Sequence, residues 1–213
     1  MNRPRHTTLR HARTGALWSA LVLVIGGWLV GCASQPQPPS YERQILQHRI
    51  EREMSLREDN SVLPPAARKR FKGLNHYPVD STYRYVVPLE RAARLDTIWM
   101  PESTGGVTPK VRVGYVDVPF PQGTARLAVF RVRGQEDLWI PFADSTNRTT
   151  TYPAGRYVDA PMQSDSLLVV DFNKAYNPTC DYNPDYACPL PPPENRIAFG
   201  VPAGEQRSNL HPY

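Results

Sequence analysis

The sequence predicts a mainly β fold, an antiparallel sandwich or partly open barrel, preceded by an N-terminal amphipathic helix and a lipoprotein signal peptide. Three features predict this: an apolar run that ends at a cysteine, a four-residue apolar period in the next segment, and alternating segments beyond residue 73. The expected organisation is a signal peptide at 1–31, a proline-rich tether at 32–40, a helical segment at 41–72, a β-rich domain at 73–206 and a C-terminal tail at 207–213.

The N-terminal segment has the three-part layout of a secretory signal. Four arginines precede an apolar run from Ala16 to Val30, which is shorter than the roughly 20 residues that a membrane-spanning helix needs. The run ends at Leu29-Val30-Gly31-Cys32, which resembles the lipobox of bacterial lipoproteins. We therefore expect cleavage before Cys32 and lipidation of its thiol with acyl chains such as palmitate. A permanent transmembrane anchor and an ordinary signal with an incidental cysteine are the alternatives.

Lipidation at Cys32 would make the membrane a partner of the mature chain and place the protein in the bacterial cell envelope. Ala33, where some lipoproteins have aspartate, favours the periplasmic side of the outer membrane if the host is Gram-negative. The following polar segment to Ser40 contains three prolines, so it should be an extended spacer of about 25 Å.

The charge balance excludes a nucleic-acid partner. The whole chain has 25 basic and 20 acidic residues, and four of the basic residues lie in the signal, which leaves 21 against 20. The mature chain therefore has no basic excess for binding phosphate backbones.

The chain contains three cysteines. If Cys32 carries lipid, Cys180 and Cys188 remain as a pair in a compartment where disulfides persist, and we expect them to form one. Zinc is disfavoured because no histidine or second cysteine pair lies near them in the sequence. We expect neither a metal nor a cofactor.

The helical segment should contain two helices. Ser40 is a suitable N-cap for a helix that runs to about residue 59, and Leu46, Ile50 and Met54 form an apolar stripe that should pack on the rest of the domain. A shorter helix should follow Pro64-Pro65, from residue 66 to 72.

Short strand-like segments separated by glycine-containing turns follow residue 73, as in antiparallel sandwiches and barrels. A strand at 167–170 has no polar alternation and should be buried on both faces. The expected strands are 83–87, 97–100, 110–115, 126–133, 138–142, 156–158, 167–171 and 196–201.

A long ordered set of motifs runs from about Phe71 to Glu205. It comprises Pro141-Phe142 with Asp144 and Thr146, Thr151-Tyr152, Gly155-Arg156-Tyr157 with Asp159, Asp171-Phe172-Asn173, Ala175-Tyr176-Asn177-Pro178 with Cys180, Cys188-Pro189-Leu190-Pro191-Pro192, Glu194-Asn195-Arg196 and Ala203-Gly204-Glu205. In these motifs the chain resembles the uncharacterised DUF1684 family, which often occurs in bacterial lipoproteins. The resemblance implies no established activity. Arg148 departs from the family pattern, which has a glycine in the turn after Thr146.

The polar residues of this region allow two interpretations. Paired carboxylates could act as acid and base, which makes Asp159, Asp171 and Glu194 the catalytic candidates. Tyrosine rings and amides are typical of surfaces that face glycans or peptides, which gives the binding candidates Asp144, Arg156, Asn173, Tyr176, Asn177, Tyr182, Asn195 and Arg196. Alternatively, these polar groups bond to loop backbone and neutralise buried charges.

Two other chemistries are not expected. The mature chain has His48, His76 and His211 as its histidines and no Gly-x-Ser-x-Gly motif, which argues against a Ser–His–Asp enzyme. The segment from Asp181 to Asp185 begins like a calcium loop but lacks the glycine and the acid that an EF-hand needs at its sixth and twelfth positions.

The sequence therefore favours a lipid-anchored binding or structural module of the cell envelope, with a glycan, cell-wall or envelope-protein partner. A carboxylate-dependent hydrolase is the alternative. Any site should lie against the loop at 173–195 rather than on the helix at 41–59, because loops of about twenty residues in compact domains usually bind something. A loop that plugs one end of a barrel is the other interpretation.

Overall fold

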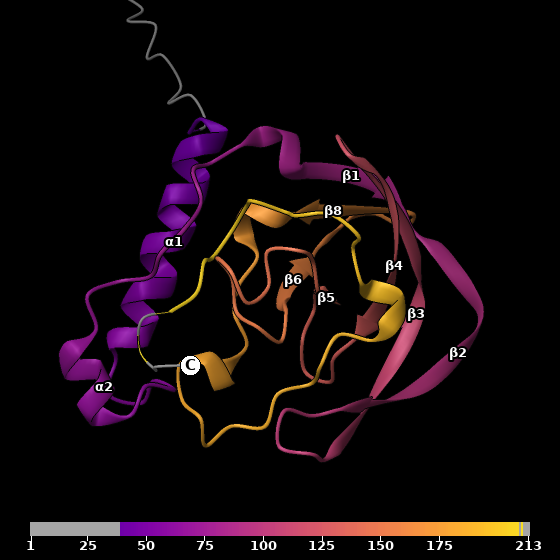
Figure 1. Cartoon of the computed structure of the whole chain (residues 1–213). Coiled ribbons are helices and arrows are strands. Elements are labelled where there is room, and N and C mark those ends of the chain that lie inside the picture. The colour runs from indigo at the N-terminus through magenta and orange to yellow at the C-terminus, as the bar shows by residue number, and fades with distance from the viewer. Residues whose placement is uncertain (1–38, 209, 211–213) are drawn as a thin grey trace, which may run out of the picture. The chain divides into compact units, whose positions relative to one another are not determined.

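The computed structural model describes residues 39–208 and residue 210. The predicted signal peptide, Cys32 and most of the predicted tether lie outside these residues. The mainly β prediction is confirmed: strands form two antiparallel sheets that do not close into a barrel, and helices are few (Figure 1). Within the described part of the chain, no helix has the length and apolarity needed to span a membrane.

The larger sheet has five strands in the order β2-β3-β4-β5-β6. Its first two strands form a long hairpin whose register shifts near Gly114, where a Cβ atom would lie 2.2 Å from the carbonyl oxygen of Glu90. Glycine is therefore required for this close approach of two backbones. The strands are β2 (Glu90–Pro101), β3 (Val107–Phe120), β4 (Gly123–Arg131), β5 (Leu138–Phe142) and β6 (Arg156–Ala160).

The smaller sheet has the order β1-β8-β7, with β1 (Arg84–Pro88), β7 (Met162–Ser164) and β8 (Leu167–Asp171). In β8, Leu168 and Val170 are fully buried, but Leu167 and Val169 are half-buried. The prediction that this strand is buried on both faces is therefore wrong. Its Leu168 face meets the main core, whereas the opposite face of this small sheet retains contact with solvent.

The main hydrophobic core lies between the two sheets. It joins Val116 and Phe120 of β3 and Ile140 of β5 to Leu168 and Val170 of β8. A second apolar cluster lies on the other face of the larger sheet, where Met100, Phe130 and Trp139 are buried together with Ala128 and Tyr157. The loop after β8 covers this outer face of β5, where its Tyr176 packs against the cluster.

Two helices, α1 (Tyr41–Arg57) and α2 (Pro65–Arg70), precede the strands. The side chain of Ser40 accepts a hydrogen bond from the backbone of Arg43, as its N-cap position predicts. Figure 1 shows the C-terminal segment running alongside α1.

The predicted apolar stripe of α1 does not face the domain. Leu46, Ile50 and Met54 are 46%, 52% and 61% exposed, whereas Ile45 and Leu56 are buried. Beside these two apolar side chains, the buried face carries Tyr41 and Arg52, which bind carboxylates of the surface that the helix meets.

The predicted strand at 196–201 is also wrong. This segment follows a 3-10 helix (Pro193–Asn195) and has one isolated bridge, between Ala143 and Arg196. From the end of this segment onward, the carbonyl oxygens of Val201, Ala203 and Glu205 accept hydrogen bonds from the side chain of Arg156. A side chain thus takes the acceptors that a neighbouring strand would otherwise use.

Candidate functional site

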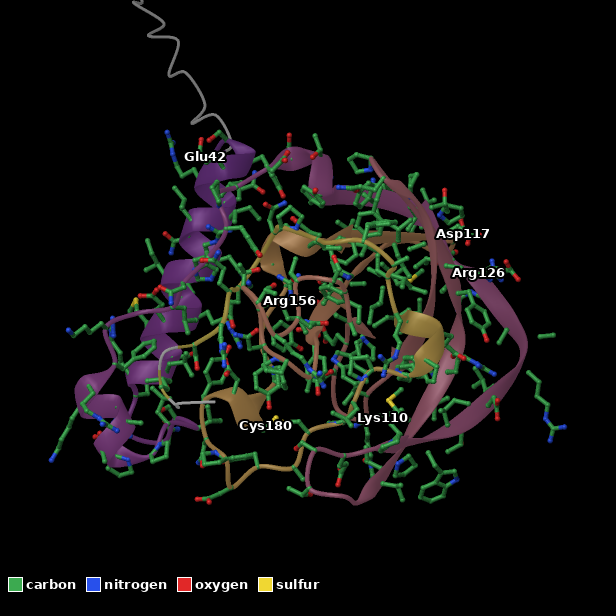
Figure 2. The ribbon with its side chains drawn as sticks, in the orientation of Figure 1. Glu42, Lys110, Asp117, Arg126, Arg156 and Cys180 are labelled. Carbon is green, nitrogen blue, oxygen red and sulfur yellow. The ribbon has the colours of Figure 1, made fainter. Side chains whose placement is uncertain are left out.

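Arg156, a predicted binding residue, is completely buried and serves the interior. Its Nη2 donates to Oδ2 of Asp144 at 2.7 Å, and both side chains are inaccessible to solvent. Figure 2 shows Arg156 among interior side chains, whereas Asp117 and Arg126 lie on the outer side of β3 and β4. Asp144 also accepts from the backbone and hydroxyl of Thr146. The pair neutralises a buried charge and fixes the C-terminal segment.

Asn195, another predicted binding residue, completes the larger sheet. Strands β4 and β5 pair through two residue pairs before they separate, and Asn195 fills the gap. Its Oδ1 accepts from the backbone N–H of Ala128 at 2.7 Å, and its Nδ2 donates to the carbonyls of Ala128 and Pro141. The amide is therefore fully occupied inside the protein.

Asp171 and Asn173 hold the chain around the end of β8. Oδ1 of Asp171 accepts from the backbone N–H of Asn173 and from the hydroxyl of Tyr41 on α1. Asn173 in turn accepts from the backbone of Asp80 and donates to its carbonyl. These contacts support a structural role for the two residues, which is to hold neighbouring segments of the chain in place.

The three catalytic candidates bind different partners on different elements. Asp159 of β6 accepts from the hydroxyl of Tyr176 at 2.9 Å, Asp171 is occupied as described, and Glu194 forms an ion pair with Arg112 at the surface. Burial raises the pKa of Asp159, and the hydrogen bond from Tyr176 opposes this more weakly. Asp159 also lines a small cavity of about 240 Å³ with Glu136 and Asp137.

The predicted tyrosines meet at a different place. Tyr176 and Tyr182 line a cavity of about 510 Å³, which we call the aromatic cavity, between α1, the outer face of the larger sheet and the loop after β8. Trp139 of β5 and Tyr157 of β6 pack edge to face with ring centroids 4.7 Å apart, and Tyr157 and Tyr176 do so at 5.8 Å. Tyr157 thus packs against both of the other rings, and the three form one rigid surface, which we call the floor of the cavity.

Two cations stand over this floor. Lys110 of β3 places its Nζ 5.7 Å from the ring centroid of Trp139, and the guanidinium of Arg52 lies 4.7 Å from that of Tyr176. Arg52 is also bound by Glu205 and by the hydroxyl of Tyr182. By contrast, Lys110 makes no ion pair with any described residue.

Two buried polar atoms at the aromatic cavity lack a hydrogen-bond partner among the described residues: Oδ1 of Asn177 and Oγ of Ser61. The amide of Asn177 is oriented by its nitrogen, which donates to Asp181 at 2.9 Å and to the carbonyl of Gln206 at 2.8 Å. Its oxygen is therefore a fixed acceptor. Leaving such a group unpaired in the interior costs about 1–3 kcal/mol.

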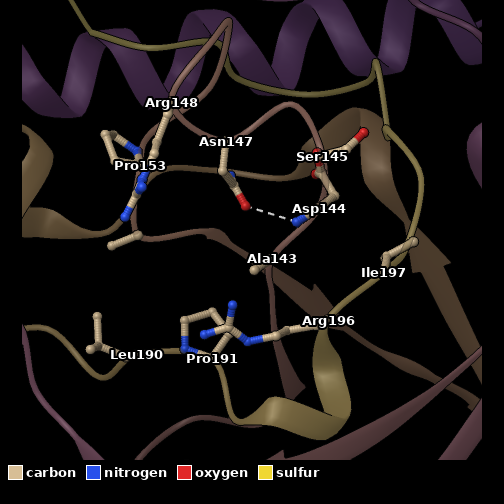
Figure 3. A pocket seen from close by; sticks show the side chains of 11 residues that line it. Ala143, Asp144, Ser145, Asn147, Arg148, Pro153, Leu190, Pro191, Arg196 and Ile197 are labelled. Atoms are coloured by element: carbon tan, nitrogen blue, oxygen red, sulfur yellow. Dashed lines mark hydrogen bonds between the residues drawn. The ribbon is translucent and has the colours of Figure 1, made fainter.

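A second cavity, of about 670 Å³, lies beyond the end of β5, and we call it the arginine cavity. Arg148 and Arg196 line it from opposite sides, and Pro153, Leu190 and Pro191 contribute apolar wall (Figure 3). Residues of the predicted 173–195 loop line both cavities. The aromatic cavity also receives side chains from α1, which the sequence argument had set aside.

Cys180 and Cys188 are both buried free thiols in the structure, so the expected disulfide is not present. They are nevertheless neighbours, because the backbone N–H of Cys180 donates to Sγ of Cys188 at 3.0 Å. The hydrogen bond from Cys188 lowers the pKa of the Cys180 thiol. No group of three or more metal-binding side chains occurs in the described part of the chain.

Several residues of the aromatic cavity were not anticipated from the sequence, among them Arg52, Lys110 and Trp139. One signal was available: β5 is apolar at all five positions, and all five are buried. A strand without polar alternation must be covered on both faces. No local pattern distinguishes Arg52 from the other charged residues of α1.

The comparison with protein families follows the same segment. The family model described as "Protein of unknown function (DUF1684)" matches residues 69–206. The chain belongs to the DUF1684 family. The matched segment includes the buried Arg156, Asn173 and Asn195, whose side chains bind other parts of the chain and maintain the fold.

A solved structure extends the likeness of this DUF1684 member. The solution NMR structure of an uncharacterized protein of Haloarcula marismortui is similar with a TM-score of 0.64 and 28% sequence identity. The similarity covers 80% of this chain and 96% of the other. A search of curated proteins found no match.

Proposed function

We propose that this chain is a lipid-anchored binding module of the bacterial cell envelope and that its ligand occupies the aromatic cavity. The observation that carries the proposal is the meeting of Lys110, Asn177 and Ser61 at one cavity with charge or hydrogen-bonding capacity left unused. Buried polar groups in folded proteins are normally satisfied. A ligand that satisfied them would recover the cost of leaving them unpaired.

The chemistry of the cavity favours a glycan or cell-wall component that carries a carboxylate. Lys110 supplies a cation for the carboxylate, and the fixed oxygen of Asn177 supplies an acceptor for a hydroxyl or amide. The rings of Trp139 and Tyr157 are buried, so they supply a rigid apolar base beneath Lys110 rather than a free face for a sugar. The ring packing reduces the side-chain entropy that binding would remove.

Cys32 would provide the tether. Each methylene of an acyl chain buried in the membrane contributes about 0.8 kcal/mol, so two or three chains would hold the protein on the bilayer. In a Gram-negative host we propose the periplasmic side of the outer membrane. Replacing Cys32 with serine should release the domain or leave an uncleaved precursor. A mature C32S species that still fractionates with membranes would place the anchor elsewhere.

Binding can be tested by sedimentation with purified peptidoglycan sacculi, using the mature lipidated chain in detergent. Lys110→Met removes the charge but keeps an aliphatic side chain over Trp139. We expect about tenfold weaker binding, which corresponds to about 1.4 kcal/mol, with an unchanged Tm.

The matched control is Lys69→Met, because Lys69 is exposed on α2. This variant should bind like the wild type. Equal binding by the K110M and K69M variants, or no binding of the wild type to sacculi, would overturn the assignment of this cavity.

A carboxylate-dependent hydrolase is the second candidate, because Asp159 has a raised pKa and shares its small cavity with Glu136 and Asp137. Burial that raises the pKa of a carboxyl group favours its use as a general acid. Release of soluble fragments from sacculi, abolished by Asp159→Asn, would favour the enzyme. Retention of sacculus binding without release of fragments would favour the binding module.

We also propose that Cys180 and Cys188 form a disulfide once the chain is exported, by thiol–disulfide exchange with an oxidised protein disulfide of the envelope, which is reduced to a dithiol and so takes up the two electrons and two protons. The bond would close a nine-residue segment and stabilise the fold by about 2–3 kcal/mol in the loop-entropy model. Intact-mass analysis of protein from the envelope, with and without reductant, should show a difference of two hydrogens. Two free thiols in that protein would end this proposal.

A further inference from the structure

We propose that Arg148 and Arg196 together bind a tetrahedral oxyanion, a phosphate or sulfate group carried by a small organic molecule, in the arginine cavity. The site is separate from the aromatic cavity and does not depend on the lipid anchor. Figure 3 shows Arg148 directed down from its turn and Arg196 reaching back past Pro191 from the opposite side.

Arg148 is held in a backbone conformation that disfavours it. Its φ is +72°, and it is the one non-glycine residue with a positive φ among the described residues. The backbone N–H of Thr149 donates to the carbonyl of Thr146, so Arg148 occupies the third position of a tight turn, where a positive φ favours glycine. An arginine in this conformation strains the backbone, whereas glycine would not. Residues in strained conformations often lie at binding sites, which makes Arg148 a candidate binding residue.

Hydrogen bonds also fix the main chain around Arg196. Its N–H donates to the carbonyl of Pro193, and the N–H of Ile197 donates to the carbonyl of Ala143 at the end of β5. The main chain that carries each guanidinium is therefore fixed by hydrogen bonds, and the two side chains face one cavity.

The charge of the arginine cavity is not compensated by the protein. Neither Arg148 nor Arg196 forms an ion pair with any described residue. Asp144 also lines the cavity, but its carboxylate is paired with Arg156 and accepts from Thr146. Both residues are exposed to solvent, and both line the same cavity, so an anion bound between them would interact with two positive charges.

The number and shape of the donors select the class of anion. A guanidinium presents a planar fork that binds two oxygens, so one fork saturates a carboxylate, whereas two forks match the three or four oxygens of a phosphate or sulfate. The walls of Pro153, Leu190 and Pro191 are apolar and would contact an organic substituent.

Three probes with the same ring test this selection: phenyl phosphate, phenyl sulfate and benzoate. Calorimetric titration of the mature chain should give affinities in the order phosphate, sulfate, carboxylate, because the dianion interacts most strongly with two cations. Inorganic phosphate should bind more weakly than phenyl phosphate, since it lacks the apolar contact. A preference for benzoate over both tetrahedral anions would contradict the proposal.

Substitutions at Arg148 separate charge from backbone strain. Arg148→Gly and Arg148→Ala should each weaken binding of phenyl phosphate about tenfold or more, through loss of one guanidinium. R148G should also raise Tm, by about 2–4 °C, because glycine adopts a positive φ without strain, while R148A should not raise it. Arg196→Gln should weaken binding to a similar degree, and Arg43→Gln, on the exposed face of α1, should leave it unchanged.

Two results would overturn the proposal. One is phenyl phosphate affinity that is equal in the wild type and in the R148G and R196Q variants, which would mean that any anion binds elsewhere. The other is absence of binding by the wild type at millimolar phenyl phosphate. A raised Tm of R148G would show that this variant is folded, so that weaker binding by it reflects the missing guanidinium and not loss of structure.

Discussion

Arg52 of α1 donates from Nε to Oε1 of Glu205 at 2.5 Å, although 153 residues separate them in the chain. Glu205 is 1% exposed, and its other oxygen accepts from the backbone of Asn177 and from the hydroxyl of Tyr182. One carboxylate therefore joins α1, the loop after β8 and the C-terminal segment. This contact also positions Arg52 at the aromatic cavity.

Glu205→Gln should destabilise the fold by about 3 kcal/mol, the lower end of the range for breaking a buried ion pair, because Arg52 is 26% exposed. Urea unfolding measures the change. Glu42→Gln on the exposed side of the same helix should alter stability by a few tenths of a kcal/mol. Similar losses in the E205Q and E42Q variants would mean that the ion pair does not hold α1 in place.

Substitutions on the two faces of α1 should change stability in the opposite way to that expected from the apolar stripe in the sequence. Ile45→Ala removes a fully buried side chain and should cost about 3 kcal/mol, whereas Met54→Lys on the exposed stripe should change stability by less than about 0.5 kcal/mol. Thermal and urea unfolding of both variants test this. A larger loss of stability in M54K than in I45A would mean that the predicted apolar stripe does pack on the domain.

Asn195 should behave as a structural residue. Asn195→Ala leaves the N–H and carbonyl of Ala128 and the carbonyl of Pro141 unpaired in the interior, and should cost about 3 kcal/mol or more. Glu194→Gln in the same 3-10 helix removes a surface ion pair and should cost less than about 1 kcal/mol. A stable N195A variant that had lost only ligand binding would return Asn195 to the list of binding residues.

Two histidines should make the fold sensitive to acid. Burial lowers the pKa of His48 and of His76 from the ordinary 6.5, so the unfolded chain binds these protons first as the pH falls. The contribution of these two histidines to the free energy of unfolding is therefore complete above about pH 6.5 and is lost as the pH falls below that value. The raised pKa of Asp159 acts in the opposite direction, because its native form binds the proton more tightly.

The urea midpoint of the wild type should therefore fall between about pH 8 and pH 5. A variant with His48→Gln and His76→Gln should show a smaller fall over the same range. Equal slopes for the two proteins would mean that other groups control the response to acid.

The local pattern of the chain was enough to predict the mainly β class, the N-cap at Ser40 and most strands, because alternation and capping depend on neighbouring residues. The same pattern could not assign the buried face of α1. That face is defined by Asp171 and Glu205, which lie more than a hundred residues further along the chain. These polar partners bind Tyr41 and Arg52, so the side of the helix that bears them, together with the buried Ile45 and Leu56, packs on the domain. The stripe of Leu46, Ile50 and Met54 faces solvent instead.

The candidate residues divide in the same way. Residue type was enough to propose a set of polar candidates in strands and loops, but the roles of those residues depended on which atoms already had partners. Arg156 and Asn195 are occupied by backbone groups of segments that are distant in sequence, so they support the fold. Lys110 and Arg148 are left without ionic partners among the described residues because the surrounding segments bring no carboxylate to them. The sequence determines which side chains are polar. Whether each polar atom has a hydrogen-bond partner is decided only when the folded chain brings donors and acceptors together.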